Sequence, residues 1–250
     1  MYINDTYIGF YLLVSIIGLF IGQFVDWINK RLIENKKIIS KEIFRSHKIN
    51  FKPNYILMIV TSIIYIMLIY KYGIKDTIIE NLNLIKYMIL TPLLLSVLVI
   101  DYKKQIIPNR LVLTMFEIGL IIAFLFGMSN VAITIDMILG MLIGASSFGV
   151  ITGILGLIYG KDSMGLGDIK LIGVLGLYFG VSNIIVISII AFLLGAISAV
   201  ILIIIKKKKL DESISFGPFI VISSFISIFV PFEILVLVLR NIFTLGRYQR

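Results

Sequence analysis

The stretch that ends the third long apolar run is Val99-Ile100-Asp101-Tyr102-Lys103-Lys104-Gln105-Ile106-Ile107-Pro108-Asn109. A second stretch of the same kind, Gly165-Leu166-Gly167-Asp168-Ile169-Lys170, comes just before another apolar run. Each stretch sets one aspartate where apolar sequence meets a short polar loop. An ionisable side chain at such a boundary is costly unless it is solvated or paired, so both positions indicate function.

The composition around these stretches is that of a membrane protein. Of the 250 residues, 59% are hydrophobic, and the mean hydropathy is +1.06. Soluble domains are roughly 45–50% apolar. The excess lies in runs long enough to cross a bilayer, which takes about 20 residues. We therefore predict an all-α fold, a polytopic integral membrane bundle of about eight transmembrane helices.

The apolar runs give the predicted spans, which are residues 7–24, 55–70, 85–100, 111–128, 131–159, 169–180, 183–205 and 219–239. We expect the first to be a retained span, because no basic segment precedes it. A tight turn at residues 180–182 should join two of the others. Glycines recur at helical spacing in the fifth span and predict close helix packing at Gly140, Gly144, Gly149, Gly153 and Gly156.

The formal net charge of +9 is concentrated in the predicted loops. Lys and Arg gather at residues 29–52, 101–110 and 206–209. By the positive-inside rule these loops face the cytoplasm, which puts both aspartate loops inside and both termini outside. The charge thus indicates topology and contact with membrane lipid. No nucleic-acid partner is expected, because the basic residues lack the interleaved aromatic residues of nucleic-acid binders.

Cysteine is absent, and His47 is the single histidine. This composition excludes disulfides, thiol catalysis, cysteine-ligated zinc and a site built from several histidines. We expect no metal site.

The chemistry that remains is that of paired carboxylates. If Asp101 and Asp168 lie close together, ionising both carboxyls costs electrostatic free energy, so the pair will share a proton. The charged member can take a proton from water while the neutral member donates a hydrogen bond to a peptide carbonyl. Such a pair titrates as a unit, so the sequence leaves open which aspartate is the base.

Neighbouring residues fit this use. Gly165 and Gly167 would let a substrate backbone approach closely. Pro108 would fix the loop that follows the first aspartate. Lys104 and Lys170 can lower the cost of a nearby carboxylate.

Structural alternatives exist for each acid. Asp168 opens a helix and could be its N-cap, and Asp101 could belong to an interfacial charge cluster. Glu117 is interpreted mainly as a packing contact between helices. Asp136 lies near the outer end of its span, on the side of the membrane away from the two aspartate loops. An alternative function is a proton- or cation-coupled transporter that uses Asp101 and Asp168, although transporter acids usually lie near the middle of the membrane.

Three motifs, in order, resemble those of type IV prepilin peptidases. Asp101 with Ile107-Pro108-Asn109 is similar to the first catalytic motif of that family, and residues 165–170 resemble its GxGDxK motif. The segment before the last span resembles the family's Phe-Gly-Pro segment in Phe216, Gly217 and Pro218. Residues 22–24 with 31–32 resemble the N-terminal segment more loosely.

The resemblance implies a peptidase of the bacterial cytoplasmic (inner) membrane. Members of this family cut the basic leader from prepilins and pseudopilins at the cytoplasmic face. Many then N-methylate the new terminus with S-adenosylmethionine. By residue match, Asp101 and Asp168 would be the catalytic pair, and Lys104, Pro108, Gly165, Gly167, Lys170, Phe216, Gly217 and Pro218 would support substrate binding.

The resemblance also suggests two regions. Residues 1–84 would be a two-span region with a basic cytoplasmic loop at 29–52, and residues 85–250 a six-span peptidase core. Many members carry two CxxC pairs that bind zinc in that loop, and this chain has none. We interpret the loop as a zinc-free remnant of the methylase region. The peptidase needs no cofactor, S-adenosylmethionine would be needed only for methylation, and the oligomeric state is left open.

Overall fold

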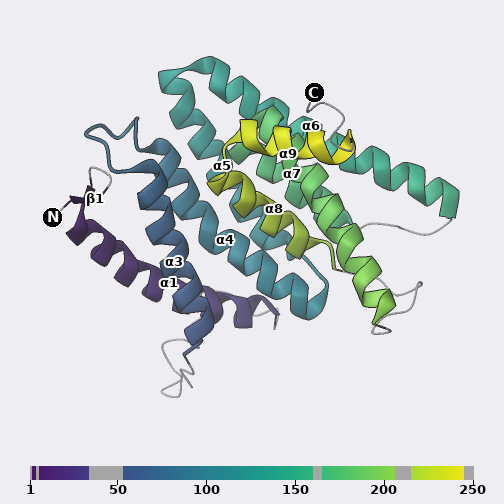
Figure 1. Cartoon of the computed structure of the whole chain (residues 1–250), viewed down its shortest axis with the longest axis horizontal. Coiled ribbons are helices and arrows are strands. Elements are labelled where there is room, and N and C mark those ends of the chain that lie inside the picture. Colours follow the sequence, from purple (N-terminus) through teal and green to yellow (C-terminus); the bar gives the residue numbers. More distant parts are fainter. Residues whose placement is uncertain (1, 4–5, 34–52, 160–164, 206–214, 245–250) are drawn as a thin grey trace. The chain divides into compact units, whose positions relative to one another are not determined.

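The computed structural model describes residues 2–3, 6–33, 53–159, 165–205 and 215–244 (Figure 1). The chain forms two compact units, Met1–Lys104 and Gln105–Arg250. Apart from a two-stranded antiparallel ribbon of β1 (Tyr2–Ile3) and β2 (Thr6–Tyr7), the described elements are helices. Six of the helices are long and apolar enough to cross a membrane. The helices confirm the predicted polytopic membrane bundle.

The first unit contains α1 (Ile8–Ile33), α3 (Tyr55–Tyr72) and α4 (Leu82–Lys104). α1 and α3 pack with their backbones close together. A Cβ added to Gly18 would lie 2.6 Å from Ser62 Cα, and one added to Gly22 would lie 2.6 Å from Met58 Cα. Ser15 and Ser62 also share a hydrogen bond of 2.9 Å. Small residues and polar bonds are the usual means by which helices associate in lipid.

α4 carries the first of the two aspartates on its buried face. Leu90, Leu94 and Val97 are fully buried, and Asp101 follows them at helical spacing with 4% of its surface exposed. We expected the span to stop at Asp101, but the helix continues to Lys104. Asp101 therefore lies inside the last turn of a helix rather than in the loop.

The second unit contains α5 (Asn109–Ser129), α6 (Val131–Tyr159), α7 (Leu166–Ile204), α8 (Gly217–Phe229) and α9 (Phe232–Phe243). α7 consists of two helices that meet at Gly180, whose φ is +72°. The Asp136 carboxylate accepts a hydrogen bond of 3.3 Å from the Val181 N–H and so caps the second helix. The predicted turn at residues 180–182 is thus confirmed.

α6 and the first half of α7 pack through glycines. A Cβ added to Gly140 would lie 2.7 Å from the Gly176 carbonyl oxygen, and one added to Gly144 would lie 2.9 Å from the Ile172 carbonyl oxygen. Within the described residues, a Cβ at Gly149 or Gly153 would meet nothing within 4 Å. The packing prediction is therefore right for Gly140 and Gly144 and wrong for Gly149 and Gly153.

The last predicted span, residues 219–239, is broken into α8 and α9. Val230 is extended, with ψ of 132°, because the following Pro231 disfavours a helical conformation before it. At 13 residues, α8 is about 20 Å long, which is shorter than the hydrocarbon core. α9 packs Leu235 and Leu239 against Val186 of α7.

Some predicted features lie outside the described residues. These are most of the basic loop 29–52, including His47, and the lysines of residues 206–209. The proposed division at residues 84 and 85 concerns which region carries which chemistry, so it stays a prediction.

The close approach of α6 and α7 gives a stability prediction. A Cβ at Gly176 would collide with the backbone of Gly140, so Gly176→Ala should cost about 1–3 kcal/mol and lower the thermal midpoint by several degrees. Thermal unfolding in detergent, followed by far-UV circular dichroism, measures this. The matched control is Gly153→Ala on α6, which should be neutral or slightly stabilising, because alanine favours a helix. Equal effects of the two changes would contradict the packing described.

Candidate functional site

The second aspartate, Asp168, lies in the first turn of α7. The N-cap of that helix is Gly165, and the Asp168 N–H donates to the Gly165 carbonyl oxygen at 3.0 Å. The interpretation of Asp168 as the N-cap is therefore wrong, because the N-cap lies three residues earlier. A carboxylate in the first turn is still favoured by the partial positive charge of the helix N-terminus.

Gly165 leaves room for that carboxylate. A Cβ at Gly165 would lie 3.3 Å from Asp168 Oδ2, so the acidic side chain folds back over the start of its own helix. Gly165 itself is exposed at the turn.

Gly167 is the point where the two motifs meet. A Cβ at Gly167 would lie 3.1 Å from Ile107 Cβ, and Ile107 is buried. Ile107 precedes Pro108, which is extended and forms the N-cap of α5. The loop that follows the first aspartate is therefore packed directly on the helical turn that carries the second.

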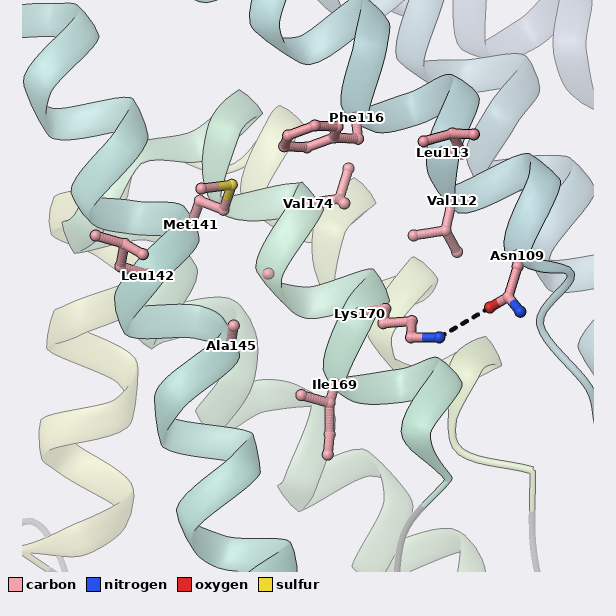
Figure 2. A pocket seen from close by; sticks show the side chains of 11 residues that line it. Asn109, Val112, Leu113, Phe116, Met141, Leu142, Ala145, Ile169, Lys170 and Val174 are labelled. Carbon is pink, nitrogen blue, oxygen red and sulfur yellow. Dashed lines mark hydrogen bonds between the residues drawn. The ribbon is translucent and has the colours of Figure 1, made fainter.

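A hydrogen bond makes a second link between the motifs. Lys170 Nζ donates to Asn109 Oδ1 at 3.0 Å, and both side chains are exposed (Figure 2). We predicted that Lys170 would favour a nearby carboxylate, but its hydrogen bond goes to a neutral amide. Asn109 could not be identified as its partner from the sequence, because the two residues are 61 positions apart.

Asp101 and Lys104 lie in the first unit, near the end of α4. Asp101 is buried, whereas Lys103 and Lys104 are exposed. Asp168 lies in the second unit. The pairing of the two aspartates, and the effect of Lys104 on it, therefore stay predictions.

The Phe-Gly-Pro segment begins α8. Phe216 is the N-cap, and Pro218 lies in the first turn, where a missing N–H costs nothing. The Phe216 ring lies 5.3 Å from the Phe192 ring and 6.0 Å from the Phe148 ring, measured between centroids. This aromatic cluster holds the start of α8 against α6 and α7. The buried Gly217 lies beside it.

Two further observations concern the remaining acids. Glu117 is exposed on α5, so its interpretation as a packing contact is wrong. In the part of the chain that the structure describes, no three side chains of His, Cys, Asp or Glu come together as metal ligands would.

The fold and these motifs define a polytopic membrane protein in which a Gly-x-Gly-Asp turn opens a spanning helix. Residues 88–200 match the type IV leader peptidase family. This similarity covers 113 of the 250 residues and includes both Asp101 and Asp168.

Three curated relatives agree with this match, and each is a "Prepilin leader peptidase/N-methyltransferase". The protein from Pseudomonas putida is 29% identical over 148 residues, which are 58% of this chain and 50% of the relative. The Neisseria gonorrhoeae protein is 31% identical over 56% of this chain and 46% of its own length. The Pseudomonas aeruginosa protein is 33% identical over 56% of this chain and 48% of its own length. The chain thus spans about half the length of the curated relatives it matches. No solved structure matches it.

The contact between the two motifs gives a second stability prediction. A Cβ in Gly167→Ala would crowd the Ile107 side chain, which must then shift by a few tenths of an ångström, at a cost of about 1 kcal/mol. Gly165→Ala is the matched control, because its φ of −66° suits alanine and the Asp168 carboxylate can rotate aside. We expect the thermal midpoint to fall clearly for Gly167→Ala and to change little for Gly165→Ala. The reverse order would contradict the contact described.

Proposed function

We propose that this chain is a membrane aspartic endopeptidase that cuts the basic leader from type IV prepilins or pseudopilins. Asp101 and Asp168 are its catalytic pair. The observation that carries the proposal is the packing of Ile107 on Gly167, which attaches the segment after the first aspartate to the turn that holds the second. The family match over residues 88–200 supports the same chemistry.

The covalent chain limits how far Asp101 can lie from this contact. Asp101 is less than one helical turn from Lys104, and only Gln105 and Ile106 separate Lys104 from Ile107. Helical rise and full chain extension together allow at most about 15 Å between the Cα atoms of Asp101 and Ile107. The short connection therefore favours a pair of aspartates over two independent acids.

Peptide hydrolysis by such a pair needs one shared proton. The ionised carboxylate takes a proton from water as the water oxygen attacks the amide carbonyl carbon. The protonated carboxyl donates its hydrogen bond to the carbonyl oxygen, where negative charge develops. The C–N bond then breaks, and a proton passes to the leaving nitrogen. Two close carboxylates suit both steps, because mutual repulsion keeps one of them protonated.

The proposal places this chemistry at the cytoplasmic face. Exposed cations follow or precede each aspartate closely in the sequence, namely Lys103 and Lys104 on α4, Arg110 on α5 and Lys170 on α7. An excess of positive charge favours the cytoplasmic side. Both termini would then lie outside. The transporter alternative has no support from the comparisons.

N-methylation of the new N-terminus would be a separate step after cleavage. The curated relatives carry both activities in their names. This chain has no cysteine with which a loop could bind zinc. We interpret its basic loop at residues 29–52 as a topology signal.

Substitution of either aspartate tests the peptidase proposal. Asp101→Asn and Asp168→Asn keep the side-chain shape but cannot share a proton as two carboxyls do, so each should slow cleavage at least about 100-fold. Cleavage of a purified prepilin by the protein in lipid, followed by gel shift and mass spectrometry, measures this.

The matched control for that test is Glu117→Gln, which neutralises an exposed acid on α5 and should leave cleavage unchanged. Circular dichroism of each variant should show that the helices are retained. Normal cleavage by a folded Asp101→Asn or Asp168→Asn variant would end the proposal.

Methyl transfer is a separate measurement. The purified protein is incubated with cleaved prepilin and labelled S-adenosylmethionine, and mass spectrometry of the new N-terminus gives the fraction methylated. We expect cleavage without methyl transfer, because the loop lacks the zinc-binding cysteines. Transfer at a rate comparable with cleavage would show that the methylase does not need them.

A further inference from the structure

A groove opens on the second unit between α5, α6 and α7 (Figure 2). Its volume is about 510 Å³, within the roughly 300–1,000 Å³ of typical ligand sites. Leu113 and Phe116 line it from α5, Leu142 and Ala145 from α6, and Val174 from α7. Its walls are thus apolar along the spanning helices.

The polar groups of the groove are confined to one end. Asn109 and Lys170 lie there, joined by the hydrogen bond from Lys170 Nζ to Asn109 Oδ1, and Phe116 lies toward the other end (Figure 2). Arg110 follows Asn109 in the first turn of α5 and is exposed. Among the described residues, no carboxylate forms an ion pair with Lys170 or Arg110. This end of the groove therefore carries positive charge without a paired carboxylate from the residues that the structure describes.

We propose that the groove binds an anionic phospholipid. The phosphate lies against the Lys170 ammonium and the Asn109 amide N–H, and one acyl chain enters the apolar part. Asn109 uses its oxygen to accept from Lys170, so its amide nitrogen is available to donate to a phosphate oxygen. Basic pockets between spanning helices near a membrane surface are suited to anionic headgroups.

The dimensions favour an acyl chain over a transmembrane helix. From Asn109 to Phe116 the groove follows α5 for seven residues, or about 10 Å. The apolar part of a transmembrane helix is about 30 Å long, so the groove would contact only about a third of such a helix. A flexible chain beneath a phosphate fits a short apolar groove that is charged at its mouth.

Brominated lipids test the site, because bromine quenches a nearby tryptophan. Trp27 is the single tryptophan of the chain, so the Trp27→Phe variant has no tryptophan fluorescence of its own. In that background Leu113→Trp reports on the groove, and Thr114→Trp is the control. Thr114 is exposed one residue further on, about 100° around the helix, and does not line the groove. Vesicles mix phosphatidylcholine with increasing brominated phosphatidylglycerol or brominated phosphatidylcholine.

We expect brominated phosphatidylglycerol to quench the Leu113→Trp reporter at roughly five-fold lower mole fraction than brominated phosphatidylcholine, the preference that one nearby cation confers. The Thr114→Trp control should show little preference. Adding Lys170→Gln to the reporter should abolish the preference, and Lys170→Arg should keep it. Circular dichroism of each variant checks that it is folded.

Equal quenching by the two lipids at Leu113→Trp would overturn the proposal, as would a preference that survives Lys170→Gln. A third outcome assigns the groove differently. If the lipids show no preference but a prepilin peptide changes the reporter's emission, the occupant is the substrate helix and the lipid proposal is wrong. The quenching measurement does not depend on cleavage, so its failure would leave the peptidase proposal standing.

Discussion

The contact between Ile107 and Gly167 is the constraint on which the candidate site depends. It exists because Gly167 has no side chain, so the backbone of α7 can receive a buried isoleucine from the loop before α5. A Cβ at residue 167 would lie 3.1 Å from Ile107 Cβ, so even alanine would require the isoleucine side chain to shift. The hydrogen bond from Lys170 to Asn109 holds the start of α5 one turn further along α7. Residues 107–109 and 165–170, which are far apart in the sequence, thus become one structural element of the second unit.

That element is held in place by the rest of α7. Where α6 and α7 cross, Gly140 and Gly176 bring two backbones together without intervening side chains. At the far end of the first half of α7, Gly180 turns the chain back, and Asp136 caps the helix that follows. The Asp136 carboxylate takes the place that a Cβ at residue 180 would occupy, so the turn and the cap require each other. An acid inside a membrane protein can therefore serve the fold rather than chemistry.

The first turn of α7 carries an acid and a cation on different faces. Asp168 and Lys170 are two positions apart, which puts them about 200° apart around the helix. Lys170 contributes to the groove between α5 and α6, while Asp168 folds back over Gly165. One turn therefore presents the proposed catalytic acid on one side and the proposed headgroup cation on the opposite side. Because Asp168 and Lys170 lie on opposite sides of the turn, a lipid at Lys170 would not block a substrate at Asp168.

The sequence by itself determined the membrane spans, the turn at Gly180 and the place of Asp168 at the start of a helix. These follow from local properties, namely the length of apolar runs, backbone freedom at glycine and the charge that a helix terminus favours. Hydropathy does not report how a helix is rotated against its neighbours. The tertiary structure therefore decided that a Cβ at Gly149 would meet no described residue, that Asn109 rather than a carboxylate binds Lys170, and that Ile107 rests on Gly167. The break at Pro231 was missed because the apolar run continues through it.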